Sequence, residues 1–271
     1  MSKNRFSAVK NIFVEGTVFD YINLDKSALS YEKLIQALQK PLKLILFFGK
    51  PGVGKTFLLR KIYQDLRNKQ PIVFFPQPFF NETQFLTSLY EEIFNNESPD
   101  IQGYEHFLKL YKSHEKTELS NAITVLLDEA QLYPDELIEK IRLMADTRLF
   151  KFLFTIHKTE KEEVLAKDYF TTRIWETVNL PDSPAEEMRL YLEKKLLYHG
   201  YFEYLSLFKT NQLRYMNKLT NGNLRTLNKL LYKFFEICEY YEEYRPTYIN
   251  RKKAKDKFIE MAAIDSGLID A

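Results

Sequence analysis

Residues 49–56 of the sequence, "GKPGVGKT", combine three glycines with two lysines and a threonine. The run fits the pattern G-x-x-x-x-G-K-[ST], in which glycines let backbone amides approach phosphate oxygens closely. A lysine in the penultimate position can contact the β- and γ-phosphates, and the threonine hydroxyl can bind Mg²⁺. The alternative is an ordinary turn between a strand and a helix. We predict a phosphate-binding loop that comprises Gly49, Lys50, Pro51, Gly52, Val53, Gly54, Lys55, Thr56 and Phe57.

A second pair of chemically competent residues follows an apolar run in "ITVLLDEAQ", residues 123–131. Asp128 stands where the predicted strand ends, so its carboxylate can hold Mg²⁺, partly through water. Glu129 beside it can polarise an attacking water molecule. The alternative is a charged loop after a buried strand. An Asn-Lys-x-Asp segment of the kind that reads guanine is missing from the sequence, which favours ATP over GTP.

The elements around these motifs alternate between strand and helix patterns. Strands buried on both faces are predicted at residues 44–49, 72–76, 122–128 and 150–156, with a weaker fifth at 177–180. Helical stripes lie between them, and Asn81 with Gln84 three residues later indicates a helix start. The stripes are Phe85, Leu86, Leu89 and Ile93, and Leu137, Ile138, Ile141 and Met144. This order predicts a doubly wound α/β domain with a parallel sheet over residues 1–181.

Helical patterns alone are found from residue 182 to 271. Ser183 is predicted to cap a helix, with Pro184 in its first turn and Glu186 completing a capping box. Apolar stripes follow at Met188, Tyr191, Leu192 and Leu196, and at Leu224, Leu227, Leu231 and Phe234. A last helix is predicted over residues 251–264. The chain therefore reads as an α/β domain followed by a small helical domain.

The composition is that of a globular protein, with 45% hydrophobic and 28% charged residues. The net charge of +2 does not by itself require a nucleic acid or a membrane as partner. The single cysteine, Cys238, excludes an internal disulfide, and the four histidines lack metal-ligand spacing. Apolar runs stay below the roughly 20 residues that span a bilayer. We expect a cytoplasmic protein without a transmembrane segment.

Together the two motifs, the alternating strands and the helical tail resemble AAA+ ATPases. The pattern is most similar to the branch that includes the general-secretion-pathway protein A ATPases and the transposition ATPases related to phage Mu B, which share features with origin-recognition initiators. The resemblance extends from about Asn11 to Leu268. It implies a P-loop sheet sandwiched by helices, a helical lid domain, ATP and Mg²⁺ as ligands, and ATP-dependent assembly of several copies.

The resemblance also assigns two residues that sense the γ-phosphate. His157 falls at the sensor 1 position, where relatives have Gln or Asn, and the alternative is a solvated loop histidine. Gly222, Asn223 and Arg225 in "LTNGNLRTLNKLL" match the sensor 2 stretch. There the resemblance implies that Gly222 and Asn223 open a helix and that Arg225 reaches the γ-phosphate. An exposed helix arginine is the alternative.

An arginine finger is implied by "YFTTRIWETVNL", residues 169–180, in which Arg173 would act on ATP held by a neighbouring copy. Arg148 and Arg142 compete for that role, and a simple ion pair between Arg173 and Glu176 is equally open. Gln77, after the second strand, is a candidate to restrain Glu129 in the resting state.

Three cellular roles fit the sequence. One is an ATPase that serves a secretion, pilus or DNA-uptake machine through a protein partner, with attachment to the inner membrane through that partner. Another is a DNA-binding ATPase of the transposition or initiator type, for which "NRKKAKDK" (250–257) offers cations, although a solvated face of the last helix explains these charges better. The third is a slow nucleotide-dependent binding switch.

Overall fold

The computed structural model describes residues 5–14, 22, 24–97, 99–114, 122–157, 173–249 and 253–270. Its contacts divide the chain into two compact units. One unit comprises Leu29–Lys50 and Lys55–Leu180, and the other comprises Met1–Ala28, Pro51–Gly54 and Pro181–Ala271. The division into domains at residue 181 stays a prediction, and each unit is described separately below.

The first unit is built on a five-stranded sheet with the order β2-β3-β4-β1-β5. All four strand pairings are parallel. The strands are β1 (Leu44–Gly49), β2 (Ile72–Phe75), β3 (Ile123–Leu127), β4 (Phe150–His157) and β5 (Ile174–Asn179). The helices are α2 (Asp25–Gln39), α3 (Lys55–Leu66), α4 (Glu82–Phe94), α5 (Tyr104–His114) and α6 (Asp135–Asp146), with a 3₁₀ turn η1 (Ala130–Leu132).

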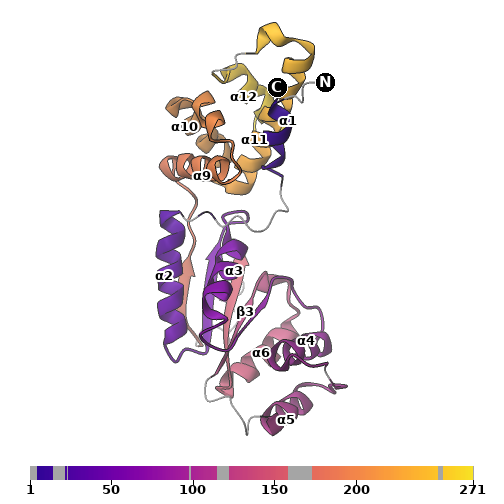
Figure 1. Ribbon diagram of the computed structural model, residues 1–271. Coiled ribbons are helices and arrows are strands. Elements are labelled where there is room, and N and C mark those ends of the chain that lie inside the picture. The colour runs from indigo at the N-terminus through magenta and orange to yellow at the C-terminus, as the bar shows by residue number, and fades with distance from the viewer. Residues whose placement is uncertain are drawn as a thin grey trace. The chain divides into compact units, whose positions relative to one another are not determined.

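Both faces of the central strands are buried, as their apolar runs predict. Every residue of β1 and of β3 is buried. Alternate side chains of β1 to β4 form one core with α4, α5 and α6, and Phe152 and Phe154 stack within it. Helix α3 packs on β1 and β2, and Ser30 of α2 donates a hydrogen bond to the carbonyl of Asn179 in β5. The predicted α/β fold with a parallel sheet is confirmed (Figure 1).

The cap of α4 agrees with the sequence prediction, and the bounds of the fifth strand differ from it. The Asn81 side chain accepts a hydrogen bond from the Gln84 amide at 2.8 Å and so caps α4 as predicted. The fifth strand begins at Ile174, earlier than residue 177, and ends at Asn179. Its alternate residues Trp175 and Thr177 are exposed, because β5 is an edge strand and only part of it is covered.

The second unit is helical in all its described elements. These are α1 (Arg5–Asn11), α9 (Ala185–Tyr198), α10 (Thr210–Thr220), α11 (Leu224–Tyr244) and α12 (Asp256–Asp265), with 3₁₀ turns η2 (Phe202–Leu207) and η3 (Pro246–Tyr248). Helix α1 packs along α11, and the rings of Phe13 and Phe235 stack at 5.7 Å. Both predicted apolar stripes point into this core. The N-terminal segment therefore belongs to the helical core rather than to the sheet.

Two helix starts in this unit differ from the prediction. Helix α9 begins at Ala185 with Pro184 at the cap position and no side-chain capping bond, so the Ser183 cap is wrong. The Ser183 amide instead donates to the carbonyl of Gly222, in the turn before α11, and the Ser183 carbonyl accepts from the Asn217 side chain of α10. Helix α12 begins at Asp256 rather than at residue 251, and residues 250–252 lie outside the described part.

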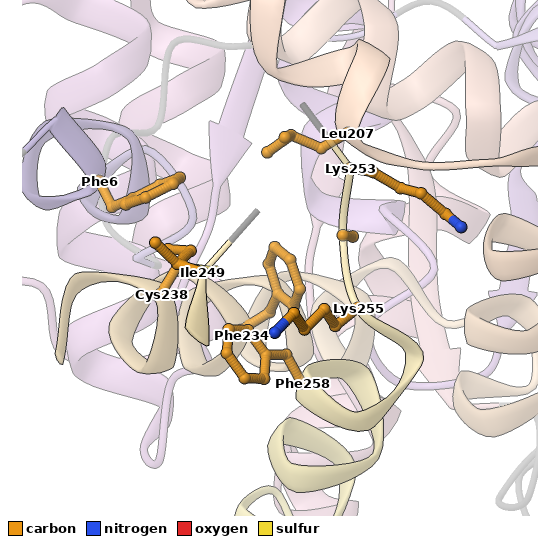
Figure 2. A pocket seen from close by; sticks show the side chains of 9 residues that line it. Phe6, Leu207, Phe234, Cys238, Ile249, Lys253, Lys255 and Phe258 are labelled. Atoms are coloured by element: carbon orange, nitrogen blue, oxygen red, sulfur yellow. The ribbon is translucent and has the colours of Figure 1, made fainter. Parts of the chain in front are cut away.

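A small cavity lies inside the helical core. Figure 2 shows Cys238, Phe234 and Phe258 among its lining residues, with Lys253 and Lys255 from the segment before α12. Its volume of about 10 Å³ is close to the minimum that holds one water molecule, so the cavity cannot admit a nucleotide. Within the described ranges, no helix is both long enough and apolar enough to cross a bilayer.

Candidate active site

The glycine-rich loop joins β1 directly to α3. Strand β1 ends at Gly49 and α3 begins at Lys55, which meets the structural condition for a phosphate-binding loop. Gly52 and Gly54 have φ angles of +79° and +106°, which residues other than glycine rarely adopt. The residues between the strand and the helix therefore take a backbone path that the sequence makes available only through its glycines.

Lys55 is buried although it carries a charge. Its ammonium group donates hydrogen bonds to the carbonyls of Gly49 and Lys50, at 3.0 Å and 3.2 Å. These bonds compensate part of the cost of burying a cation. They also fix a positive charge at the loop, where a phosphate would be received.

Thr56 and Asp128 meet although 72 residues separate them in the sequence. The Thr56 hydroxyl donates to Asp128 Oδ2 at 2.5 Å, and Asp128 is almost fully buried. Burial raises the pKa of Asp128, while hydrogen bonds from Thr155 and Thr56 act in the opposite direction. Burial without a cation is unfavourable for this carboxylate, so the site favours a positively charged ligand.

The oxygen atoms of Thr56 and Asp128 are the hard ligands that Mg²⁺ prefers. Among the residues that the structure describes, no three His, Cys, Asp or Glu side chains gather into a cluster able to hold a metal ion. A hydroxyl and one carboxylate next to a phosphate-binding loop fit an ion that takes its remaining ligands from phosphate oxygens and water. The residues present thus fit Mg²⁺ bound together with a nucleotide.

Glu129 is held in an unusual conformation at the end of β3. Its φ of 52° and ψ of 42° lie in the left-handed region, which is uncommon for a residue with a side chain. Its carboxylate accepts a hydrogen bond from Gln131 at 2.5 Å, and His157 Nε2 lies 3.0 Å from Oε2. Glu129 and His157, predicted separately, therefore lie together at the ends of β3 and β4.

Two residues that contact Asp128 or Glu129, namely Gln131 and Thr155, were not predicted from the sequence. Gln131 contacts Glu129, whereas Gln77, the residue expected to restrain Glu129, is exposed. Thr155 of β4 contacts both Asp128 and the Glu129 amide. A threonine within a strand is an ordinary strand former, so neither its type nor its spacing marked it.

A family model described as "AAA domain" matches residues 25–165, which include both motifs and the sheet from β1 to β4. The chain belongs to the AAA domain family. Its fold is that of an AAA+ P-loop ATPase. A comparison with curated proteins gave no significant match.

Three solved structures illustrate the proteins to which the fold of this AAA chain is similar. Cdc6p from Pyrobaculum aerophilum matches with a TM-score of 0.69 and 14% identity, over 95% of this chain and 71% of Cdc6p. The Aeropyrum pernix ORC1 protein in complex with DNA has a TM-score of 0.62 and 16% identity, over 94% and 69% of the two chains. The Thermotoga maritima RuvB Holliday junction branch migration motor has a TM-score of 0.56 and 13% identity, over 90% and 70%. At these identities the likeness concerns the fold.

The predicted sensor 2 stretch of the AAA chain begins at a tight turn in the helical unit. Asn223 caps α11 by accepting a hydrogen bond from the Thr226 amide, so the predicted helix start is confirmed. Its side-chain amide also donates to the carbonyl of Pro51 at 2.5 Å, and Pro51–Gly54 groups with this unit. Arg225 lies on the exposed side of α11, and its role as a sensor stays a prediction.

Arg173, the predicted finger of the AAA chain, lies in a cluster of charges. Its Nε is 3.6 Å from Asp146, which also contacts Arg142 and Lys43. Asp146 is therefore one ion-pair partner of Arg173, while Glu176 pairs with Lys40. These contacts lower the pKa of Asp146, first of all through the hydrogen bond from Lys43. Arg148, the third candidate, has a left-handed backbone with φ of 63°.

Proposed function

We propose that this protein binds ATP with Mg²⁺ and hydrolyses it. The observation that carries the proposal is the 2.5 Å contact between Thr56, at the start of the helix after the glycine-rich loop, and Asp128, at the end of β3. A hydroxyl and a buried carboxylate brought together beside a buried lysine form a site for a metal-bound polyphosphate. An ordinary turn between a strand and a helix would not require this contact with a residue from a distant motif.

Each residue has a distinct part in this proposal. Backbone amides of the 49–57 stretch, except at Pro51, which has no N–H, and the Lys55 ammonium bind phosphate oxygens, and Thr56 and Asp128 hold the metal ion. The bound ion neutralises phosphate charge. Glu129 accepts a proton from the attacking water as general base, and His157 orients the Glu129 carboxylate or donates to the γ-phosphate.

The proposal assigns two further arginines to the bound nucleotide. Arg225 senses the γ-phosphate from the helical unit, and Arg173 acts on ATP bound to a neighbouring copy. For Arg173, this requires that it exchange its ion pair with Asp146 for a phosphate. The proposal therefore includes a homo-oligomer that forms with ATP.

Lys55→Ala and Glu129→Gln separate binding from hydrolysis. We expect Lys55→Ala to abolish nucleotide binding or turnover, because the loop loses its fixed cation. Glu129→Gln should keep ATP binding and lose about 10²–10⁴-fold in turnover, the usual contribution of a general base. Isotope-labelled ATP binding and phosphate release measure the two steps.

Matched variants control for changes that are only structural. Lys61→Ala alters a lysine on the same helix that pairs with Asp65, and Glu136→Gln alters a glutamate in the first turn of α6. Both should hydrolyse ATP like the wild type. Undiminished hydrolysis by Glu129→Gln contradicts the assigned base.

The process that ATP hydrolysis serves has two candidates. The first, which rests on the sequence resemblance to the general-secretion-pathway protein A branch, is a cytoplasmic switch or motor for a secretion, pilus or DNA-uptake machine, bound to the inner membrane side through a protein partner. The second is a DNA-acting ATPase. It is favoured by the fold shared with ORC1, solved in complex with DNA, and with RuvB, a branch migration motor.

DNA binding at low salt separates the two candidates. A DNA-acting ATPase should bind duplex DNA more weakly as salt rises, because phosphate contacts release counterions, and DNA should change its turnover. The absence of DNA binding at low salt excludes the second candidate. A slow binding switch, by contrast, would bind ATP and hydrolyse it at a rate that neither DNA nor a protein partner changes.

The mass of the protein with ATP tests the finger. Glu129→Gln should trap ATP, so any ATP-dependent oligomer should accumulate and be visible by light scattering. A monomer under these conditions contradicts a trans-acting role of Arg173.

A further inference from the structure

Thr155 lies fully buried on β4, the strand between the two strands that carry the predicted motifs. Strand β1 leads into the glycine-rich loop, β3 ends before Asp128, and β4 pairs with both. In the register of the sheet Thr155 is opposite Phe47 of β1. Thr155 therefore lies on the strand between the glycine-rich loop and Asp128, although it is part of neither motif.

The Thr155 hydroxyl makes two different hydrogen bonds at once. It donates to Asp128 Oδ1, and it accepts from the backbone amide of Glu129 at 3.0 Å. A hydroxyl has one hydrogen to donate and lone pairs to accept, so both bonds can form together. Thr155 thus contacts the carboxylate of Asp128 and the backbone amide of Glu129 at the same time.

The first bond determines how the Asp128 carboxylate is oriented. Oδ1 accepts from the Thr155 hydroxyl and, at 3.0 Å, from the Glu129 amide, while Oδ2 accepts from Thr56. With Oδ1 occupied on the β4 side, Oδ2 is the oxygen presented to the start of α3. Rotation of this carboxylate would break bonds on both sides.

The second bond holds the backbone of Glu129. The left-handed conformation of this residue persists only where its surroundings enforce it. The Glu129 amide donates to Thr155 Oγ1 and to Asp128 Oδ1, and these two acceptors fix the direction of the peptide. The same conformation determines where the Glu129 side chain leaves the chain.

We propose that Thr155 is the positioning residue that fixes the Asp128 carboxylate and the left-handed Glu129 backbone together. The inference rests on the proposed ATP hydrolysis for its kinetic consequence, but not for its structural one. Removing the hydroxyl should impair the chemical step while leaving ATP recognition by the glycine-rich loop intact.

Three variants test the proposal. Thr155→Val replaces the hydroxyl by a methyl group of similar size, and Thr155→Ser keeps the hydroxyl. Thr124→Val is the matched control, because Thr124 is also a buried threonine, on β3, but makes no described contact with Asp128 or Glu129. For Thr155→Val we expect kcat to fall about 10–100-fold, the change that corresponds to losing a hydrogen bond to a charged group, with KM for ATP within about threefold. Thr155→Ser and Thr124→Val should stay close to the wild type.

Amide hydrogen exchange provides a readout without nucleotide. In the free protein, the Glu129 amide should exchange at least about tenfold faster in Thr155→Val than in the wild type or in Thr124→Val, because one of its two acceptors is lost. This measurement tests the inference even if the wild-type protein does not hydrolyse ATP, in which case only the proposed function fails. Unchanged exchange at Glu129 in Thr155→Val, or a loss in Thr155→Ser as large as in Thr155→Val, overturns the proposal.

Discussion

Gly222 offers a sharp test of how rigidly the turn before α11 is packed. Its φ is +70°, and a Cβ added there would lie 2.4 Å from the carbonyl oxygen of Ser183 and 3.1 Å from its nitrogen. Gly267, in the same unit, has the same φ of +70° and nothing within 4 Å of an added Cβ. Gly222→Ala and Gly267→Ala therefore share the backbone strain and differ in the steric contact.

The expected magnitudes follow from these contacts. A left-handed alanine costs roughly 1–2 kcal/mol, and this applies to both variants. In Gly222→Ala the obstacle is backbone, so Ser183 must move away. That movement weakens the hydrogen bond from the Ser183 amide to the Gly222 carbonyl, now 3.1 Å long, and costs about 1 kcal/mol. With overpacking of about 1–3 kcal/mol, Gly222→Ala should lose roughly 2–4 kcal/mol more than Gly267→Ala.

Urea unfolding followed by circular dichroism measures the difference. With a slope of about 2 kcal/mol per molar urea, the midpoint of Gly222→Ala should lie about 1–2 M below that of Gly267→Ala. Equal midpoints for the two variants would mean that the Ser183 backbone yields freely, and the steric reasoning would be refuted.

Further measurements probe other parts of the chain. Lys26 is buried, and burial lowers its pKa to about 8. Between pH 8 and about 10.5 the unfolded chain therefore binds more protons than the folded chain, so the free energy of unfolding of the wild type should rise with pH relative to that of Lys26→Met. The same pH dependence in both proteins would contradict this. Asn81→Ala should cost about 1 kcal/mol in urea unfolding through loss of the α4 cap, and Asn81→Ser should restore most of it. Trp175 is 73% exposed, so Trp175→Phe should change stability by less than about 0.5 kcal/mol; a larger loss would show that the ring is covered in solution.

The strands and the loop were predictable from the sequence because their signals are local. The run 44–49 is apolar because both faces of β1 are covered. The glycines that follow indicate backbone with positive φ angles, which Gly52 and Gly54 have. Asp128 could be placed because it directly follows such a run. In each case a few neighbouring residues contain the whole reason for the structure.

Thr155 and the N-terminal helix could not be placed, because their roles depend on distant partners. Only the order of the strands puts Thr155 beside Asp128, and the sequence does not state that order. Helix α1 finds its place against α11, and the carbonyl of Arg5 accepts a hydrogen bond from Tyr204, 199 residues away. Ser183 shows that a local signal can also mislead. The sequence predicts that its side chain caps a helix, but its backbone is hydrogen-bonded to Gly222 and Asn217, which are distant in the sequence.

The order of the strands also has a consequence for synthesis on the ribosome. Strands β1 and β3 are not neighbours in the sheet, and β4 must be inserted between them before Thr56 and Asp128 can be held in register. A nascent chain that has emerged only as far as Asp128 contains both motifs but not the strand that joins them. Because domains tend to fold as units while they emerge, nucleotide binding should begin only after residue 157 has left the exit tunnel. ATP would then bind once β4 has joined β1 to β3, as a ligand that stabilises these paired strands before β5 adds to the edge of the sheet.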